Sequence, residues 1–224
     1  MSWALEDLLP FSPRVYWRLF ALENEALWPA QPVLLAAVVL LAFCFIRGWR
    51  PSGRWLGPVL GAAWLWAGWQ FVALRYGTIN WAAPTFAWGF YAEAALLAAL
   101  GLSGRLVFLR RGRGAWPGIS LLAAAALLWP AYAPLDGRSW HEAEVLAVAP
   151  DPTAVATLGL LALAERSRWT ALLCIAPALW LALSVLTLVT MGAWQGWVVL
   201  TALLAGLAAC AALARDPTGG SGYA

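Results

Sequence analysis

Glu93 is the residue of this chain that most clearly indicates chemistry, because it is the single carboxyl side chain in a long apolar stretch. It lies 11 residues into the stretch 82–102. A helix there carries it roughly 16 Å down, to the middle of a bilayer. An ionisable residue at that depth is costly and usually faces the interior of a helical bundle. Glu93 therefore predicts a proton or cation relay, or a polar contact for a bound solute. The alternative is a neutral Glu that hydrogen-bonds to another helix.

A second polar set lies where the apolar stretches end. Its members are Asn24, Glu25, Gln31, Gln70, Asn80, Glu142, Glu144, Asp151 and Thr153. Gln31 and Gln70 lie just inside stretch ends, where an unpaired amide is costly. We expect the set to cap a shallow, outward-facing polar cavity that leads toward Glu93. Ordinary hydrogen bonding at the level of the lipid headgroups is the alternative. The candidate binding residues are Glu93, Asn24, Glu25, Gln31, Gln70, Asn80, Asp151 and Thr153.

Metal-binding and catalytic patterns are weak. His141 is the only histidine, and with Glu142, Glu144 and Asp151 it could hold a divalent cation. One His with scattered acids lacks the fixed geometry of a good site, so a solvated acidic loop is favoured. We interpret the three cysteines as small apolar core residues: Cys44, Cys174 and Cys210. The alternative is a thiolate metal site, which is disfavoured because they are assigned to three different helices with no CxxC pair and no nearby His. We predict no metal and no catalytic residue.

Several functions are excluded by what the sequence lacks. All 14 basic residues are Arg, so a retinal Schiff base and a Walker-type lysine are both impossible. A single His excludes bis-His haem ligation within the chain, and we find no GxSxG, HExxH or phosphate-binding glycine loop. We therefore expect no cofactor and favour a protein that is not an enzyme. The net charge of +3 follows from membrane topology and indicates no nucleic-acid partner.

The elements that must position these residues are apolar helices. The chain is 63% hydrophobic and 11% charged, whereas soluble domains carry about a quarter charged residues. Seven apolar stretches predict an all-α, seven-span transmembrane bundle with spans at 28–46, 55–74, 82–102, 115–134, 152–164, 169–190 and 196–214. The fifth is short for a crossing unless it begins near Val145 and passes through Pro150 and Pro152. Such an interrupted helix is tolerated only inside protein or beside a water-filled cavity.

The charge pattern predicts an orientation, because arginine concentrates in cytoplasmic loops. Every second loop is rich in Arg, and the loops between them are poor in Arg or acidic. With the N-terminus outside, ten Arg face the cytoplasm and four face outward. An odd number of spans then places the C-terminus inside. This is the pattern of a multi-pass protein of the bacterial inner membrane.

Domain organisation follows from the same pattern. We expect an interfacial N-terminal segment over 1–26, with a helical apolar stripe at 15, 16, 19, 20 and 22, and no signal peptide. The transmembrane domain covers 27–215, and 216–224 form a flexible tail. Gly57 and Gly61 form a GxxxG pair that predicts close helix packing. Tryptophans predicted at span ends, as anchors in the membrane interface, are Trp28, Trp49, Trp55, Trp81, Trp116, Trp129, Trp169, Trp194 and Trp197. Those expected to pack deeper, between helices, are Trp64, Trp66, Trp88 and Trp180.

From Leu9 almost to the C-terminus the chain resembles a family of uncharacterised bacterial inner-membrane proteins, known only as a domain of unknown function and sometimes labelled transporter permeases. The motifs that carry the resemblance are Leu9-Pro10-Phe11, Glu23-Asn24-Glu25-Ala26-Leu27-Trp28-Pro29-Ala30-Gln31, Leu65-Trp66-Ala67-Gly68, Ile79-Asn80 and Pro150-Asp151-Pro152-Thr153. Family members often carry Cys where this chain has Asp151, which counts against a thiol or soft-metal role at that position. The resemblance implies a polytopic membrane fold.

Together these features favour a small permease or a membrane-embedded protein that binds a small solute or ion, with Glu93 as the buried charge partner. The alternative is an accessory or structural subunit of a larger membrane complex, with tryptophan-rich and GxxxG faces as its interfaces. The expected partners are the lipid bilayer and either other membrane subunits or further copies of the chain.

Overall fold

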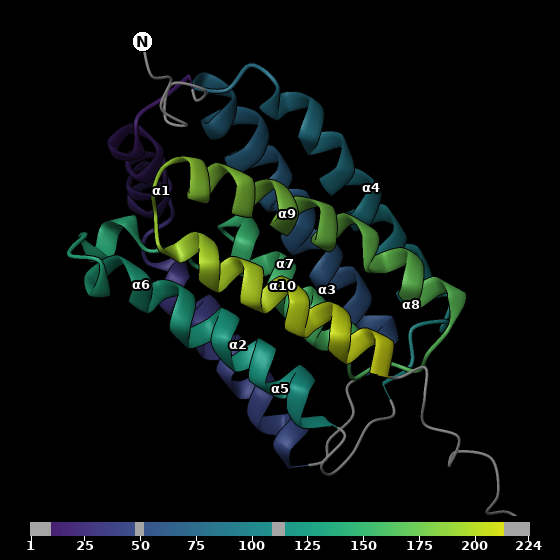
Figure 1. Ribbon diagram of the computed structural model, residues 1–224. Helices are drawn as coiled ribbons and strands as arrows, with labels where there is room; N and C mark the ends of the chain where they lie inside the picture. The colour runs from purple at the N-terminus through teal and green to yellow at the C-terminus, as the bar shows by residue number, and fades with distance from the viewer. Residues whose placement is uncertain (1–9, 48–51, 109–114, 213–224) are drawn as a thin grey trace, which may run out of the picture.

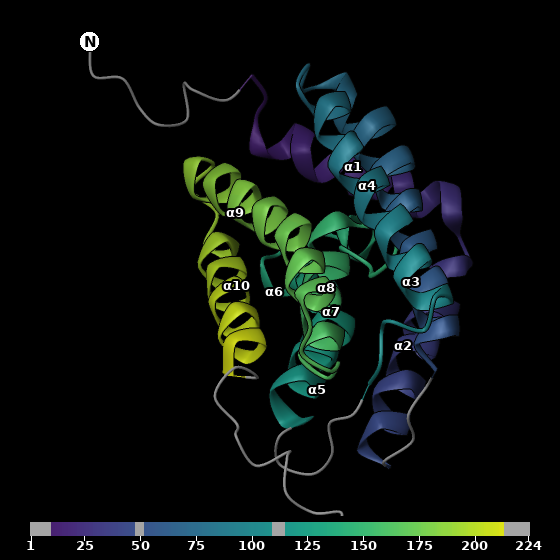
Figure 2. The same ribbon diagram turned by 90° about the vertical axis from the view of Figure 1, so that its right-hand side faces the viewer.

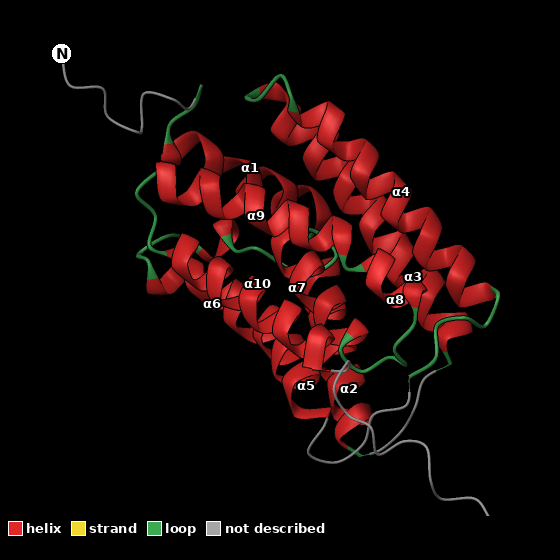
Figure 3. Cartoon of the chain, turned by 45° about the vertical axis from the view of Figure 1, so that its right-hand side comes forward, coloured by secondary structure: helices red, strands yellow, loops and turns green. Residues whose placement is uncertain are grey.

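The computed structural model describes residues 10–47, 52–108 and 115–212, and within them the chain is almost entirely helical (Figure 3). The helices are α1 (Pro13–Leu27), α2 (Ala30–Ile46), α3 (Gly53–Trp66), η2 (Ala67–Arg75), η3 (Tyr76–Thr78), α4 (Ala83–Leu102), α5 (Trp116–Ala123), η5 (Ala124–Leu128), α6 (Trp129–Leu135), η6 (Trp140–Glu142), α7 (Pro150–Leu161), α8 (Arg168–Leu173), α9 (Ile175–Thr190) and α10 (Gln195–Ala212). The described residues contain no strand, only a single bridge between Phe108 and Ala164. The all-α prediction is confirmed. The predicted tail 216–224 lies outside the described residues.

Within the part of the chain that the structure describes, three helical segments are long and apolar enough to cross a membrane: Ala83–Leu102, Trp116–Leu135 and Arg168–Thr190. A fourth crossing results if α1 and α2, which meet at a bend of 94°, are counted as one broken span. α10 is apolar but shorter. The predicted bundle of apolar helices is therefore present, with fewer full-length crossings than the seven that the sequence pattern indicates.

The N-terminal helix that the sequence predicts near residues 15–22 is present as α1. Ser12 caps it by accepting a hydrogen bond from the backbone of Val15 at 3.4 Å, and Pro13 occupies its first turn. Tyr16 and Phe20 on its apolar stripe are buried. The Phe20 ring stacks on Phe71 of η2, with centroids 4.4 Å apart. The stripe thus packs on the rest of the protein.

α3 and α4 form the most closely packed pair of helices, joined through η2 and η3. A Cβ at Gly57 would lie 2.6 Å from the carbonyl oxygen of Leu97, and one at Gly61 would lie 2.7 Å from that of Ala94. Only glycine allows two backbones to approach this closely. The close packing that the Gly57 and Gly61 spacing predicts is confirmed.

α7 occupies the centre of the bundle. All of its 12 residues are buried, and it contacts α3, α5, α9 and α10. Figure 2 shows it between the pair α9 and α10 on one side and α3 with α4 on the other. At about 1.5 Å per residue it reaches roughly 18 Å, less than the roughly 30 Å of a bilayer core. This central, enclosed position is the one in which a short, proline-started helix at membrane depth is tolerated.

The connecting segments gather at two opposite ends of the bundle. At one end, here called the arginine end, Phe45 packs on Phe108, Arg105 stacks on Trp169, and Phe108 pairs with Ala164. At the other, here called the acidic end, residues 23–24, 75, 136–144 and 194–195 meet through hydrogen bonds and an ion pair. Consecutive long helices run between these ends (Figure 1).

The tryptophans follow the sequence prediction in part. Six of those predicted at span ends are exposed: Trp28, Trp55, Trp81, Trp116, Trp194 and Trp197. Trp129 is instead buried, and Trp49 lies outside the described residues. Trp64 and Trp180 pack deep between helices as predicted, whereas Trp88 points outward from α4. The prediction for Trp129 and Trp88 was wrong because distance along a helix does not fix which face a residue occupies.

Candidate functional site

Glu93 lies in the middle of α4 and is 1% exposed. Its Oε1 atom has no hydrogen-bond partner among the described residues. The side chain lines a cavity of about 580 Å³ between α4 and the α8–α9 segment. Because a buried carboxyl oxygen without a partner costs free energy, its presence beside a cavity marks a place where a ligand could supply the missing contact.

The walls of this cavity are mainly aromatic and aliphatic. The aromatic residues are Trp64, Phe86, Phe90 and Trp180, and Thr85 adds a hydroxyl. Phe90 packs against both indoles, with ring centroids 4.7 Å from Trp64 and 4.9 Å from Trp180. Apolar pockets of this size with a few polar groups are typical of small-molecule sites, and aromatic faces attract cations.

Polar residues of α7 hold the two indoles in place. The Trp64 indole N–H donates to Thr157 at 2.8 Å, and the Trp180 indole N–H donates to Asp151 at 2.7 Å. Asp151 also accepts a hydrogen bond from Ser184 of α9. A buried indole N–H with a fixed acceptor keeps one ring orientation. The enclosed helix α7 therefore sets the shape of the Glu93 cavity without lining it.

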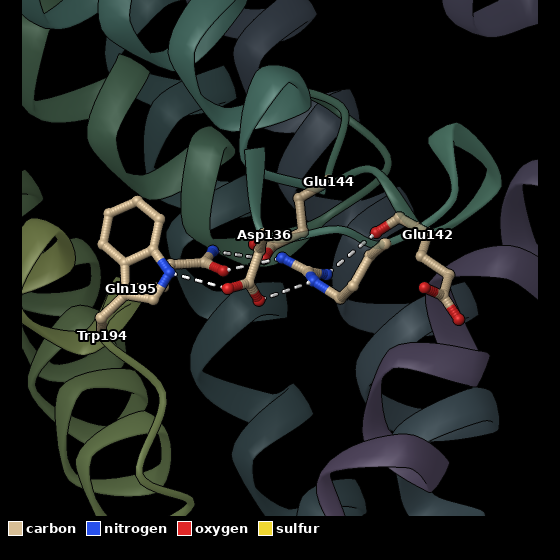
Figure 4. A network of polar contacts seen from close by, with 6 residues as sticks. Asp136, Glu142, Glu144, Trp194 and Gln195 are labelled. Atoms are coloured by element: carbon tan, nitrogen blue, oxygen red, sulfur yellow. Dashed lines mark hydrogen bonds and ion pairs between the residues drawn. The ribbon is translucent and has the colours of Figure 1, made fainter. Parts of the chain in front are cut away.

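A hydrogen-bonded network joins the loops at the acidic end (Figure 4). Gln195 donates to the buried carboxylate of Glu144 at 2.6 Å and accepts from Arg138 at 3.1 Å. Arg138 also pairs with Asp136 at 3.2 Å, and Asp136 accepts from the indole of Trp194 at 2.8 Å. The network fixes the 136–144 segment to the start of α10.

Glu144 is 3% exposed. Burial, and after it the nearby charge of Asp151, raise the pKa of its carboxyl to about 8, while the hydrogen bond from Gln195 and the charge of Arg138 act in the opposite direction. Glu144 therefore holds its proton at neutral pH more readily than an exposed glutamate. It lies close enough to Asp151 for the two carboxyls to influence each other.

The predicted polar set is divided among several local roles. Asn24 donates to the backbone oxygens of His141 and Ala143 at 2.8 and 2.7 Å, and Gln31 donates to the backbone oxygen of Asn24 at 2.6 Å. These bonds join α1, α2 and η6, and Gln31 Oε1 has no partner among the described residues. Neither Asn24 nor Gln31 lines the Glu93 cavity.

The other members of the set are placed separately. Asn80 accepts from the backbone of Ala82 at 3.0 Å and so helps to begin α4. Thr153 accepts from the backbone of Ala147 at 2.9 Å and donates to Ala149, which holds the turn before α7. Glu25 is exposed and Gln70 is half-buried. Of the candidates other than Glu93 itself, Asp151 is the one that a hydrogen bond connects to the cavity wall, through Trp180.

Sequence reasoning missed the partners that complete these arrangements. The candidates did not include Gln195, Ser184 or Arg138. They also did not include the ion pair at 2.9 Å between buried Glu23 and half-buried Arg75. Ser184 carried a sequence clue, because it is a hydroxyl in a strongly apolar helix. The others lie near helix ends, where polar residues are ordinary.

The described residues hold no group of three or more His, Cys, Asp or Glu that could bind a metal ion. His141 lies on the exposed side of η6. The combination of His141 with Glu142, Glu144 and Asp151 therefore does not form a cation site in the described part of the chain.

A family model described as "Family of unknown function (DUF6064)" matches residues 13–218. The chain belongs to this family. The resemblance to an uncharacterised family is thus confirmed over nearly the whole chain, including every residue of the Glu93 cavity. No curated protein and no solved structure matches the chain. DUF6064 has no assigned activity, so the functional interpretation rests on the geometry of the site.

Proposed function

We propose that this member of DUF6064 is a membrane-embedded protein that binds a small solute in the Glu93 cavity and acts as a small permease for it. The observation that carries the proposal is the Glu93 carboxyl, which is buried midway along α4 beside the cavity, with one oxygen that no described residue hydrogen-bonds. A solute with a positively charged or hydrogen-bond-donating group would satisfy that oxygen. The aromatic walls favour an apolar body on the same molecule.

The membrane setting of the proposal is supported by the arrangement of the helices. The arginine end, where cytoplasmic loops are expected, carries Arg54, Arg105, Arg166 and Arg168. The acidic end carries Glu23, Asp136 and Glu144. We therefore infer a multi-pass protein of the bacterial inner membrane with its N-terminus outside. The seven proposed membrane segments are α1–α2, α3–η2, α4, α5–α6, α7, α8–α9 and α10.

Native mass spectrometry of the protein, extracted gently from its own membrane, tests the proposal. A chain or homo-oligomer that carries a bound small molecule supports it, and the added mass indicates the ligand. A stoichiometric foreign subunit with an empty Glu93 cavity would overturn it in favour of the accessory-subunit role.

A further inference from the structure

Two cysteines that lie 36 positions apart in the sequence meet at the arginine end. Cys174 stands at the junction of α8 and α9, and Cys210 lies near the end of α10. Their thiols interact directly with each other. Both line a pocket of about 220 Å³, whose other polar residues are Arg166, Ser167 and Thr170. The third cysteine, Cys44, lies on α2 and does not line this pocket.

The surroundings differ from those of ordinary core cysteines. Both thiols are only half-buried, so a small ion can reach them from the pocket. Cys210 is oriented by a contact from its sulfur to the carbonyl oxygen of Leu158 at 3.7 Å. On the pocket wall, Ser167 and Thr170 bond to each other in a capping box that fixes the start of α8.

The ligand chemistry of such a pair is narrow. Zinc and hard cations need four or more ligands in closed sites. No third His, Cys, Asp or Glu joins the pair within the described residues. Soft monovalent ions such as Cu(I) prefer thiolate sulfur and form stable complexes with two such ligands. Two thiols on the wall of the same small pocket can supply both of these ligands.

We propose that Cys174 and Cys210 form a two-coordinate site for a soft monovalent metal ion, with Cu(I) as its representative. Binding replaces two S–H bonds by two S–Cu bonds and releases two protons to the solvent, with no change in oxidation state. The bound unit carries one net negative charge. The Arg166 guanidinium at the pocket balances that charge. This pocket shares no lining residue with the Glu93 cavity.

Competition for Cu(I) against bicinchoninate, with the reduced full-length chain in detergent under anaerobic conditions, tests the proposal. The wild type should withdraw one Cu(I) per chain. Cys174→Ala and Cys210→Ala should each weaken binding at least about 100-fold, more than the loss of an outer-shell partner does. Cys44→Ala should bind like the wild type. Equal Cu(I) uptake by all four proteins, or loss only in Cys44→Ala, would overturn the proposal.

A second measurement uses the wild-type protein alone and so does not depend on the folding of any variant. Wild-type protein is alkylated with N-ethylmaleimide, with and without one equivalent of Ag(I), and each cysteine is read by peptide mass spectrometry. Ag(I) should protect Cys174 and Cys210 together and leave Cys44 unaffected. The same extent of alkylation at Cys174 and Cys210 with and without Ag(I) would contradict the site.

Discussion

Glu144 is the clearest case in which the environment of one residue changes its chemistry. Its carboxyl is buried, accepts a hydrogen bond from Gln195 and lies near the charge of Asp151. Because burial raises the pKa of this carboxyl, the folded protein holds its proton more tightly than the unfolded chain does. The stabilising effect is fully present below the ordinary pKa of 4.5 and is lost as pH rises through about 8.

Glu144→Gln should therefore remove part of the pH dependence of stability. We expect the free energy of unfolding of the wild type to fall between pH 5 and pH 8.5, by at most about 1.4 kcal/mol per pH unit from this group. The amide variant should fall less, because it cannot ionise. Thermal unfolding in detergent at several pH values measures both.

Glu142→Gln is the matched control, since its side chain points away from the network in Figure 4. It should show the wild-type pH dependence. An unchanged pH dependence in Glu144→Gln would contradict the assignment of the raised pKa to Glu144.

At the residue scale, sequence reasoning singled out Glu93 and missed the hydrogen-bonding partners of the other polar residues. Glu93 was identifiable because a lone carboxyl in a long apolar helix is costly wherever it lies. Gln195 and Arg138 could not be identified in this way, because a polar residue near a helix end carries no comparable free-energy cost of burial. Which of them meet depends on how α10 docks against the 136–144 segment, and no local pattern encodes that docking.

At the scale of helices, contact between α3 and α4 depends on the absence of side chains at Gly57 and Gly101. A methyl group at Gly57 would meet the Leu97 carbonyl oxygen at 2.6 Å and the Gly101 Cα at 2.8 Å. These are backbone atoms, so relief requires the helices to separate. The separation would also displace Glu93, which α4 carries.

Gly57→Ala should destabilise the protein by about 1–3 kcal/mol, the usual cost of overpacking. Gly89→Ala on the exposed face of α4 is the control, because a Cβ there meets nothing within 4 Å. That control should be neutral or slightly stabilising, since alanine favours a helix over glycine. Denaturation in detergent compares the two, and equal stabilities would contradict the close contact.

The GxxxG spacing predicted this contact, yet the sequence did not reveal the role of α7. Its apolar part reads as a short crossing segment, whereas the helix is 12 residues long and buried on every side. Its hydrophobicity was correctly identified. Its position could not be identified from the sequence, because a helix surrounded by protein and a helix surrounded by lipid are both apolar on every side.

At the scale of the whole molecule, the two ends differ in charge, and this difference supports a defined orientation in a membrane. Ser139 lies exposed at the acidic end and Ser103 lies exposed at the arginine end. If the positive-inside pattern sets the topology, these two positions are on opposite sides of the bilayer.

Ser139→Cys should react with a membrane-impermeant maleimide in intact cells, and Ser103→Cys should react only after permeabilisation. Peptide mass spectrometry distinguishes the new cysteines from Cys44, Cys174 and Cys210. Labelling of both positions from the same side would contradict the proposed orientation and the count of crossing segments on which it rests.

The central claim is that Glu93 holds a solute in the cavity between α4 and α9. The most direct test compares ligand occupancy by native mass spectrometry in wild type, Glu93→Gln and Glu25→Gln, all extracted identically. Glu25 is the control because it is an exposed carboxyl outside the cavity. Hydrogen bonds to a charged group contribute about 1.5–3 kcal/mol, so Glu93→Gln should bind about tenfold to 150-fold more weakly. We predict a bound mass in the wild type and Glu25→Gln that is largely lost in Glu93→Gln. Equal occupancy in all three, or none in the wild type, would contradict the account.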